Sequence, residues 1–278
     1  MAMATHDSGA RWKTFLSEAK EQEITLLLSG QTASPVIDVS FHELTGFDPE
    51  FAEDILISPR LIISSGHKTL SEICRDRGVD LDAMIRLSDL PKDTMRPLRE
   101  IGSRDIDKLR SLDVIVTKMS QLKPRIHLAV FQCETCGETQ QIDQTNESEL
   151  VEPIRCPPDT GCGASIRGTD STRFNLVMNI SRMINNQWLE IQELPENVPS
   201  GAQPSRAQVL LEGDLVNKHL PGQRITANVI PVVRSEIKKN KKTPMFDIIY
   251  HMVSSTHESV PFTEIKISDE ERTQIEDV

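Results

Sequence analysis

The cysteine pattern constrains this 278-residue chain more than any other feature of its sequence. Four of its five cysteines form two pairs, Cys133-x2-Cys136 and Cys156-x5-Cys162, separated by a spacer of about twenty residues. Two short cysteine loops at this separation bring four thiolates to one tetrahedral ion, which is typical of structural zinc. Four thiolates leave no open position for water, so the pattern does not favour a catalytic zinc.

Two disulfides or a redox-active Cys-x-x-Cys are the alternatives to zinc. No secretory segment is recognisable before the cysteines, and cytosolic disulfides are rare, so zinc is favoured. His127 could replace one cysteine as a ligand. Cys74 has no cysteine near it in the sequence and is expected to be a small buried hydrophobe. We expect Gly137, Gly161 and Gly163, which flank the cysteines, to permit the positive φ that tight metal loops require.

Residues 10 to about 100 are predicted to be helical. Apolar residues recur there at helical spacing. They are Trp12, Phe15, Leu16 and Ala19 in one run and Phe51, Ala52, Ile55 and Leu56 in another. A short extended run at 36–40 interrupts the pattern, and Ser40 with Glu43 forms a predicted capping box for the next helix. Pro59 is expected in the first turn of a helix.

From about residue 101 the apolar pattern changes to the period of two that is typical of strands. The predicted strands are 112–119, 125–132, 167–175, 187–194, 207–212, 225–233 and 246–253. Several short strands with turns between them fit a small closed barrel such as an OB-fold. The cysteine segment is then an insertion between two of its strands.

The charge distribution restricts any nucleic-acid contact to a local surface. The net charge is −11, but residues 101–265 carry only −2. Between the last two predicted strands, residues 234–242 hold five basic side chains and one acidic one, which suits contact with phosphates. A solvated surface turn is the alternative. The basic residues are Arg234, Lys238, Lys239, Lys241 and Lys242.

Arg125 and Arg182 lie near the ends of predicted barrel strands and are expected to line one face, although they could be surface arginines without a special role. Aromatic residues are scarce in the β segment, so base stacking is a weaker expectation than contact with the phosphate backbone. No phosphate-binding loop, His-Glu-x-x-His or Gly-x-Ser-x-Gly motif is present, and the chain is not expected to hydrolyse nucleotide. No apolar run is long enough to suggest a membrane span.

Taken together, these motifs resemble the N-terminal half of the minichromosome maintenance (MCM) replicative helicases, of archaeal type. The resemblance covers residues 10–265. Besides the cysteine insertion, it is carried by 41–60 in the helical part, by 189–201, and by Gly213-Asp214-Leu215-Val216 followed by 221–225. The Glu190–Arg206 stretch resembles the family's communication loop, which implies roles for Gln192, Glu193 and Arg206. Where the family usually has Pro-Arg, this chain has Pro204-Ser205-Arg206.

The resemblance implies an α+β, multi-subdomain fold. A helical bundle, residues 1–103, precedes an OB-fold barrel formed by 104–130 and 169–265. The barrel carries a zinc-binding insertion at 131–168 and a long basic β-hairpin at 230–253. Residues 266–278 are expected to be a linker toward an ATPase domain that this sequence lacks.

The resemblance also implies a function. Family members assemble into hexamers or double hexamers that encircle single- or double-stranded DNA without sequence preference, and they act with other replication factors. The family is an ATP-dependent DNA helicase, so ATP and Mg2+ would be needed only in the motor domain. The expected location is intracellular, in the cytoplasm or nucleoid, with no membrane partner. The alternative is a single-stranded-DNA-binding protein built from an OB-fold and a zinc ribbon.

Overall fold

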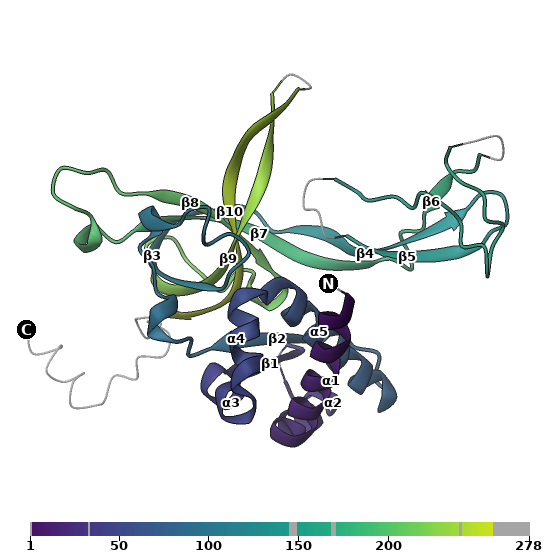
Figure 1. Ribbon diagram of the computed structural model, residues 1–278, viewed down its shortest axis with the longest axis horizontal. Coiled ribbons are helices and arrows are strands. Elements are labelled where there is room, and N and C mark those ends of the chain that lie inside the picture. The colour runs from purple at the N-terminus through teal and green to yellow at the C-terminus, as the bar shows by residue number, and fades with distance from the viewer. Residues whose placement is uncertain (1, 33, 145–148, 168–170, 239–240, 258–278) are drawn as a thin grey trace, which may run out of the picture. The chain divides into compact units, whose positions relative to one another are not determined.

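The computed structural model describes residues 2–32, 34–144, 149–167, 171–238 and 241–257 (Figure 1). The chain divides into two compact units. The first comprises residues 1–120 and 188–278, and the second comprises 121–187. The second unit therefore contains more residues on both sides than the insertion expected at 131–168. The linker expected at 266–278 lies outside the described residues. None of the helices in the described ranges has the length and hydropathy needed to cross a bilayer.

The N-terminal part of the first unit is mainly helical, as predicted. Its elements are α1 (Ala2–Ala19), α2 (Glu21–Leu28), β1 (Val36–Ser40), α3 (Phe41–Phe47), α4 (Pro49–Ile57), α5 (Pro59–Asp76) and β2 (Met84–Ser88). The strand β2 was not predicted, and it pairs in parallel with β1. The helical interpretation of this stretch was wrong because a strand of five residues with a buried arginine, Arg86, carries no clear apolar alternation.

Two of the predicted helix starts are confirmed. The Ser40 hydroxyl accepts from the His42 backbone N–H, and the Glu43 carboxylate accepts from the Ser40 backbone N–H, which closes the capping box. Pro59 occupies the first turn of α5. A proline is tolerated there because the first backbone N–H groups of a helix have no partner within the helix.

The helical core is centred on Trp12 of α1, which is fully buried and faces α5. Its indole Nε1 donates to the backbone oxygen of Ile62 at 2.8 Å. Gly66 makes this approach possible, because a Cβ at that position would lie 2.8 Å from the indole and 2.9 Å from Ile85. Ala19, which was expected on the buried face, is exposed, and the next residue, Lys20, is buried instead.

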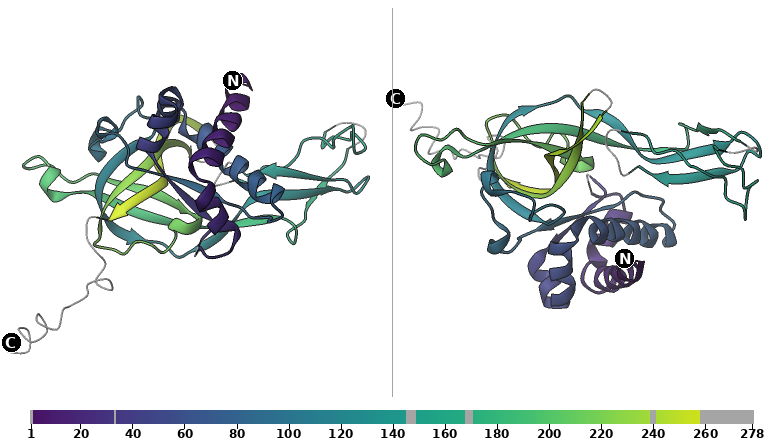
Figure 2. Two further views of the ribbon diagram at one scale, coloured as in Figure 1. Left: turned by 90° about the horizontal axis from the view of Figure 1, so that it is seen from below. Right: turned by 45° about the horizontal axis from the view of Figure 1, so that its top comes forward.

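The remainder of the first unit is a closed five-stranded barrel, as predicted for an OB-fold. Its strands are β3 (Arg110–Met119), the part of β7 (Arg182–Glu193) from Trp188 onward, β8 (Arg206–Glu212), β9 (Arg224–Lys238) and β10 (Lys241–His257). The hydrogen-bonded order is β3-β9-β10-β8-β7, and β3 also pairs with β7, which closes the barrel. Short 3-10 helices are η1 (Lys92–Thr94), η2 (Leu98–Glu100), η3 (Pro195–Asn197) and η4 (Gly213–Leu215). Figure 2 shows the closed ring of strands with the helices on one side of it.

The two long strands β9 and β10 serve two cores at once. Alternate residues of a strand face opposite sides. Ile225, Ala227 and Val229 point into the barrel, whereas Ile230 and Val232 pack against the helical core. A buried ion pair joins the same parts, because the Arg86 guanidinium of β2 lies 2.6 Å from the Asp214 carboxylate of η4.

The second unit contains β4 (Lys123–Cys133), β5 (Thr139–Asp143), β6 (Phe174–Leu176) and the first part of β7. Each of the other three strands pairs antiparallel with β4. The strand predicted at 167–175 was wrong in extent, because only Phe174 and Asn175 of its described residues belong to β6. Arg173, within the predicted range, instead binds the first cysteine loop, because its carbonyl accepts from the Glu134 N–H at 3.0 Å.

Candidate metal centre and nucleic-acid surface

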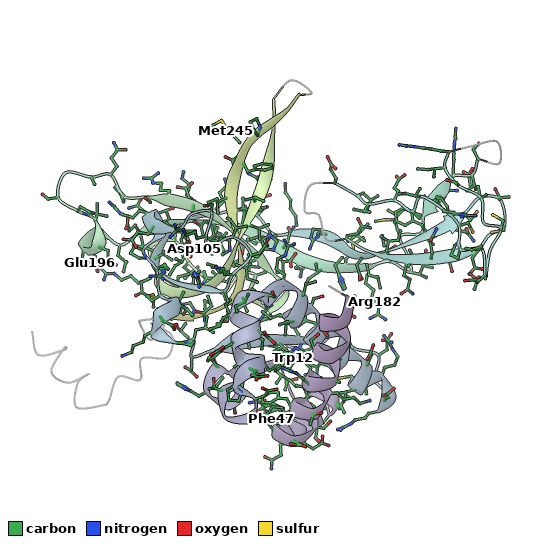
Figure 3. All side chains as sticks on the ribbon, viewed as in Figure 1. Trp12, Phe47, Asp105, Arg182, Glu196 and Met245 are labelled. Carbon is green, nitrogen blue, oxygen red and sulfur yellow. The ribbon has the colours of Figure 1, made fainter. Side chains whose placement is uncertain are left out.

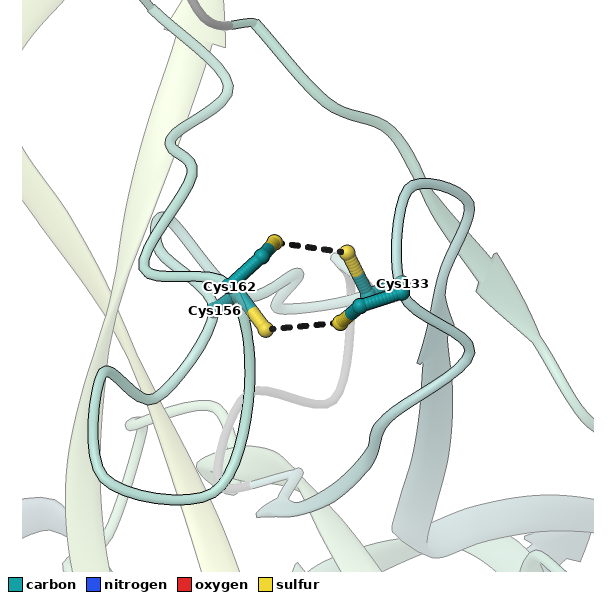
Figure 4. Close-up of side chains that lie close together, drawn as sticks. Cys133, Cys156 and Cys162 are labelled. Atoms are coloured by element: carbon teal, nitrogen blue, oxygen red, sulfur yellow. Dashed lines mark hydrogen bonds between the residues drawn. The ribbon is translucent and has the colours of Figure 1, made fainter.

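The four paired cysteines converge on one point in the second unit. Their Sγ atoms all lie within 4.8 Å of one another. Cys133 and Cys162 are 3.7 Å apart, and Cys136 and Cys156 are 3.6 Å apart (Figure 4). A disulfide requires about 2.05 Å, so these thiols are not bonded in pairs. A tetrahedral ion with Zn–S bonds of about 2.3 Å would separate its sulfurs by about 3.8 Å, so the spacing fits four ligands of one ion.

Local backbone geometry holds the cysteines in place. Gly137 adopts a φ of +78° and Gly163 one of +69°, as the sequence predicted. Gly161 has a different role from the one predicted. Its φ is not positive, but a Cβ there would collide with the Cys156 sulfur, so the position requires glycine for space. His127 is not part of the four-cysteine group, so the expectation that it could be a ligand finds no support.

The two buried thiols of the group have opposite environments. The Thr172 hydroxyl, 3.3 Å from the Cys133 sulfur, lowers the pKa of that thiol by hydrogen bonding. Burial raises the pKa of the Cys156 thiol. The Thr135 hydroxyl in turn donates a hydrogen bond to the Thr172 hydroxyl at 2.9 Å. A cation that replaces the thiol protons would compensate the burial of charge at Cys156.

The hairpin predicted between the last two barrel strands is present and long. β9 and β10 pair from His257 opposite Ile225 to Lys241 opposite Lys238, with an irregularity between Lys242 and Phe246. Figure 1 shows it projecting from the barrel. Lys239 lies outside the described residues. For Lys238, Lys241 and Lys242 the backbone is described as strand.

Below the tip, the hairpin carries one cation next to an aromatic ring and two exposed apolar side chains. The Arg234 guanidinium lies 5.8 Å from the centroid of the Trp188 ring, which is a cation–π contact. Met245 (labelled in Figure 3) and Phe246 are 71% and 55% exposed. Arg234 therefore belongs to the hairpin surface, as predicted, but its position is fixed by an aromatic partner that the sequence did not indicate.

Arg125 and Arg182 both lie in the second unit, rather than at the ends of barrel strands. Arg125 in β4 is opposite Ile184 in β7, and Arg182 is two residues before Ile184 on the same strand. Strand alternation therefore places both arginines on one face of this ladder. The Arg125 guanidinium donates to the Gln144 carbonyl at 3.0 Å, and Arg182 is labelled in Figure 3.

The loop between β7 and β8 is closed at its base by hydrogen bonds between its two ends. Glu193 N–H donates to the Ser205 carbonyl at 3.0 Å, and Arg206 Nε donates to Gln192 Oε1 at 3.1 Å. Of the three predicted residues, Gln192 and Arg206 thus contact each other. The Glu193 carboxylate accepts from the Ser205 backbone N–H at 3.4 Å and is bound by Arg99, with distances of 2.8 Å from Nε to Oε1 and 2.6 Å from Nη2 to Oε2.

Sequence reasoning missed the partners that hold this loop. Arg99 lies 94 residues from Glu193, and Arg224, which binds Glu196 at 2.5 Å, lies 28 residues from it. Glu193 is 2% exposed at its side chain, and the Arg99 guanidinium lowers its pKa. No local sequence pattern predicts these two ion pairs, because the residues of each pair are distant in the sequence and come into contact only in the folded chain.

These features define a class of OB-fold domains with a four-cysteine insertion. The class has a helical part, a closed OB barrel with a long hairpin, and the cysteine unit inserted in the sequence between two barrel strands. Residues 97–234 match the family model of the MCM OB domain. The crystal structure of the N-terminal domain of an archaeal MCM matches with a TM-score of 0.78 and 27% identity, covering 92% of this chain and 100% of that one. The chain belongs to the MCM family and corresponds to its N-terminal domain.

Full-length relatives are similar over the same region. The minichromosome maintenance protein MCM of Saccharolobus solfataricus is 28% identical over 255 residues, which cover 86% of this chain and 35% of that protein. DNA replication licensing factor mcm4-A of Xenopus laevis is 26% identical over 255 residues, covering 87% of this chain and 28% of that protein. The chain thus spans about a third of the length of these relatives.

Proposed function

We propose that this chain is the DNA-binding, ring-forming N-terminal part of a hexameric replicative helicase. The observation that carries the proposal is the long hairpin of an MCM-type barrel, whose sequence is basic at the tip in a chain of net charge −11. A local cationic element on an acidic protein concentrates phosphate contacts at one place.

The hairpin residues proposed to contact phosphates are Lys238, Lys239, Lys241, Lys242 and Arg234. In a hexamer, six hairpins would form a cationic belt in the channel. Ammonium groups contact phosphates without reading bases, so binding would be independent of sequence. Arg125 and Arg182, on one face of the β4–β7 ladder, would add a second cationic surface to the same function.

Cys133, Cys136, Cys156 and Cys162 are proposed to hold one structural Zn2+. The ion would supply no reaction chemistry there. It would cross-link the loop after β4 to the loop that contains Cys156, because the strands nearest these loops, β5 and β6, have only five and three residues. In the family role, the zinc-bearing units of two rings meet head to head in a double hexamer.

The β7–β8 loop is proposed to relay the state of bound DNA through Gln192, Glu193 and Arg206 to an AAA+ motor that uses ATP and Mg2+. Its base is rigid, since the Glu193 carboxylate is fixed by Arg99 and the Arg206 guanidinium by Gln192. A rigid base is what a relay element needs, because a loop that moved independently would transmit nothing. Other replication factors are further partners in this proposal, and its setting is intracellular.

The test is a comparison of two charge-matched double variants. Lys239→Ala with Lys241→Ala removes two hairpin charges, and Lys13→Ala with Lys92→Ala removes two charges from exposed sites in the helical part and at η1. Affinity for unrelated DNA sequences is measured by fluorescence anisotropy at two salt concentrations. The hairpin variant should weaken binding to all sequences alike and flatten the salt slope by about one for each phosphate that the variant no longer neutralises. The matched variant should bind like the unaltered chain.

A second outcome would favour the single-strand-binding alternative. Phe246 is exposed on the hairpin, and Trp188 lies beneath Arg234, so stacking on bases is physically possible. If Phe246→Ala abolishes binding while the lysine variant leaves it unchanged, base stacking replaces phosphate contact and the proposed role of the hairpin lysines is wrong.

A further inference from the structure

The strand β1 presents a free edge. In the described residues, its sheet contains only β1 and β2. Met84 N–H donates to the Pro35 carbonyl at 2.9 Å. In a parallel ladder this bond directs the main-chain groups of Ile37 and Val39 toward β2. The N–H and C=O of Asp38 therefore point away from β2, where a further strand could pair with them.

A groove runs beside this edge. It is open to solvent and has a volume of about 420 Å³ between β1, the start of α3 and the helix α2. One wall carries Leu26, which is 48% exposed on α2. The floor is rigid, because the buried Lys20 ammonium is bound at 3.0 Å by both Glu23 and Glu43. An exposed apolar side chain next to free main-chain groups offers two modes of contact to an extended peptide.

The charge of the groove indicates which peptide would fit. Its lining contains three carboxylates, Glu23, Asp38 and Glu43, and one ammonium, Lys20. Two of the carboxylates share that ammonium, and Asp38 is exposed on the edge strand itself. The groove therefore has an excess of negative charge, which favours lysine or arginine side chains and disfavours acidic ones.

We infer that the β1 edge and its groove bind an extended, basic segment of a partner protein, which pairs with β1 as an additional strand. The Asp38 main chain would exchange hydrogen bonds with the segment, the carboxylates would receive its basic side chains, and Leu26 would cover an apolar residue between them. This site lies in the helical part and is independent of the DNA contacts proposed for the hairpin, so it would give the protein a place to receive a protein partner while DNA is bound.

The probe is a fluorescein-labelled hexapeptide of alternating lysine and valine, and the control peptide has glutamate in place of lysine. Anisotropy should show binding of the basic peptide only, and hydrogen exchange should slow at the Asp38 amide. Asp38→Lys should weaken binding by about tenfold or more, whereas Glu53→Lys, an equal charge change on an exposed site of α4, should leave it unchanged.

A pair of variants separates strand pairing from simple charge attraction. Asp38→Ala and Asp38→Pro both remove the carboxylate, but only the proline also removes the outward N–H, and it leaves the bonds to β2 intact, as slow exchange at the Ile37 and Val39 amides would verify. Asp38→Pro should bind the basic peptide about tenfold more weakly than Asp38→Ala does, the value of one lost hydrogen bond. Equal binding of both peptides, or equal effects of Asp38→Lys and Glu53→Lys, would overturn the inference. A changed oligomeric mass in Asp38→Lys would also overturn it, because the edge would then pair with a second copy of this chain.

Discussion

Glu193 is a carboxylate whose charged state the fold requires. It is buried, it accepts hydrogen bonds from the Nε and Nη2 groups of Arg99, and it is the last residue of β7. Arg99 lowers the pKa of Glu193 below the value of the unfolded chain. A depressed folded pKa contributes stability above the unfolded pKa, and this contribution is lost as the pH falls through the folded pKa.

Replacing Glu193 by glutamine tests that contribution. Glu193→Gln should lower the free energy of unfolding by about 2 kcal/mol at pH 7, because the half-buried Arg99 guanidinium loses the charge of its buried partner. The difference between the two proteins should shrink as the pH falls below the ordinary pKa of a glutamate carboxyl and the unaltered Glu193, whose pKa Arg99 lowers, becomes protonated as well. Urea denaturation at pH 7 and pH 3 measures both values, with the exposed Glu18→Gln as control. An equal difference at both pH values would contradict the role assigned to the ion pair.

At the scale of elements, we expect the cysteine loops to depend on the proposed metal ion rather than on a core. The strands β5 and β6 have five and three residues, and few side chains between them are buried. Cys133→Ser should therefore remove about one zinc per chain and speed amide exchange throughout 121–187, with little change in α1–α5. Cys74→Ser is the matched control, since Cys74 is buried in the helical core and should keep the zinc. Full zinc content in Cys133→Ser would rule out these four ligands as the metal site.

The elements that the sequence predicted well are those whose signal is local. The two cysteine pairs, the capping box at Ser40 and the alternating strands of the hairpin each follow from a few neighbouring residues. Prediction was poorest where contacts between distant residues decide the structure. The strand β2 forms because it pairs with β1, and position 161 requires glycine because a Cβ there would collide with the Cys156 sulfur. Neither feature could be inferred from the neighbouring residues in the sequence.

At the scale of the whole molecule, the sequence motifs indicate a family, but no motif in the sequence predicts how many copies of the chain assemble. Contacts between copies would be made by surfaces that are separate in the sequence, as Arg99 and Glu193 are within one chain. The acidic net charge of −11 opposes association, whereas DNA that neutralises the hairpin belt would favour it. Assembly of this chain is therefore expected to be strongest when DNA is bound.

Light scattering after size exclusion measures this assembly directly. On DNA longer than the channel, the expected mass is that of the DNA plus six or twelve chains of 31.2 kDa each. Without DNA the same species should dissociate more readily at high protein dilution, because the cationic belt is no longer compensated.

Cys133→Ser should convert any twelve-chain species into a six-chain one while the hexamer persists, since the zinc-bearing units are proposed to join two rings and not neighbours within a ring. Lys239→Ala with Lys241→Ala should keep the ring mass without DNA and lose the DNA complex. A single chain on a short oligonucleotide, with the same mass in the presence and absence of DNA, would instead assign the protein to the single-strand-binding class.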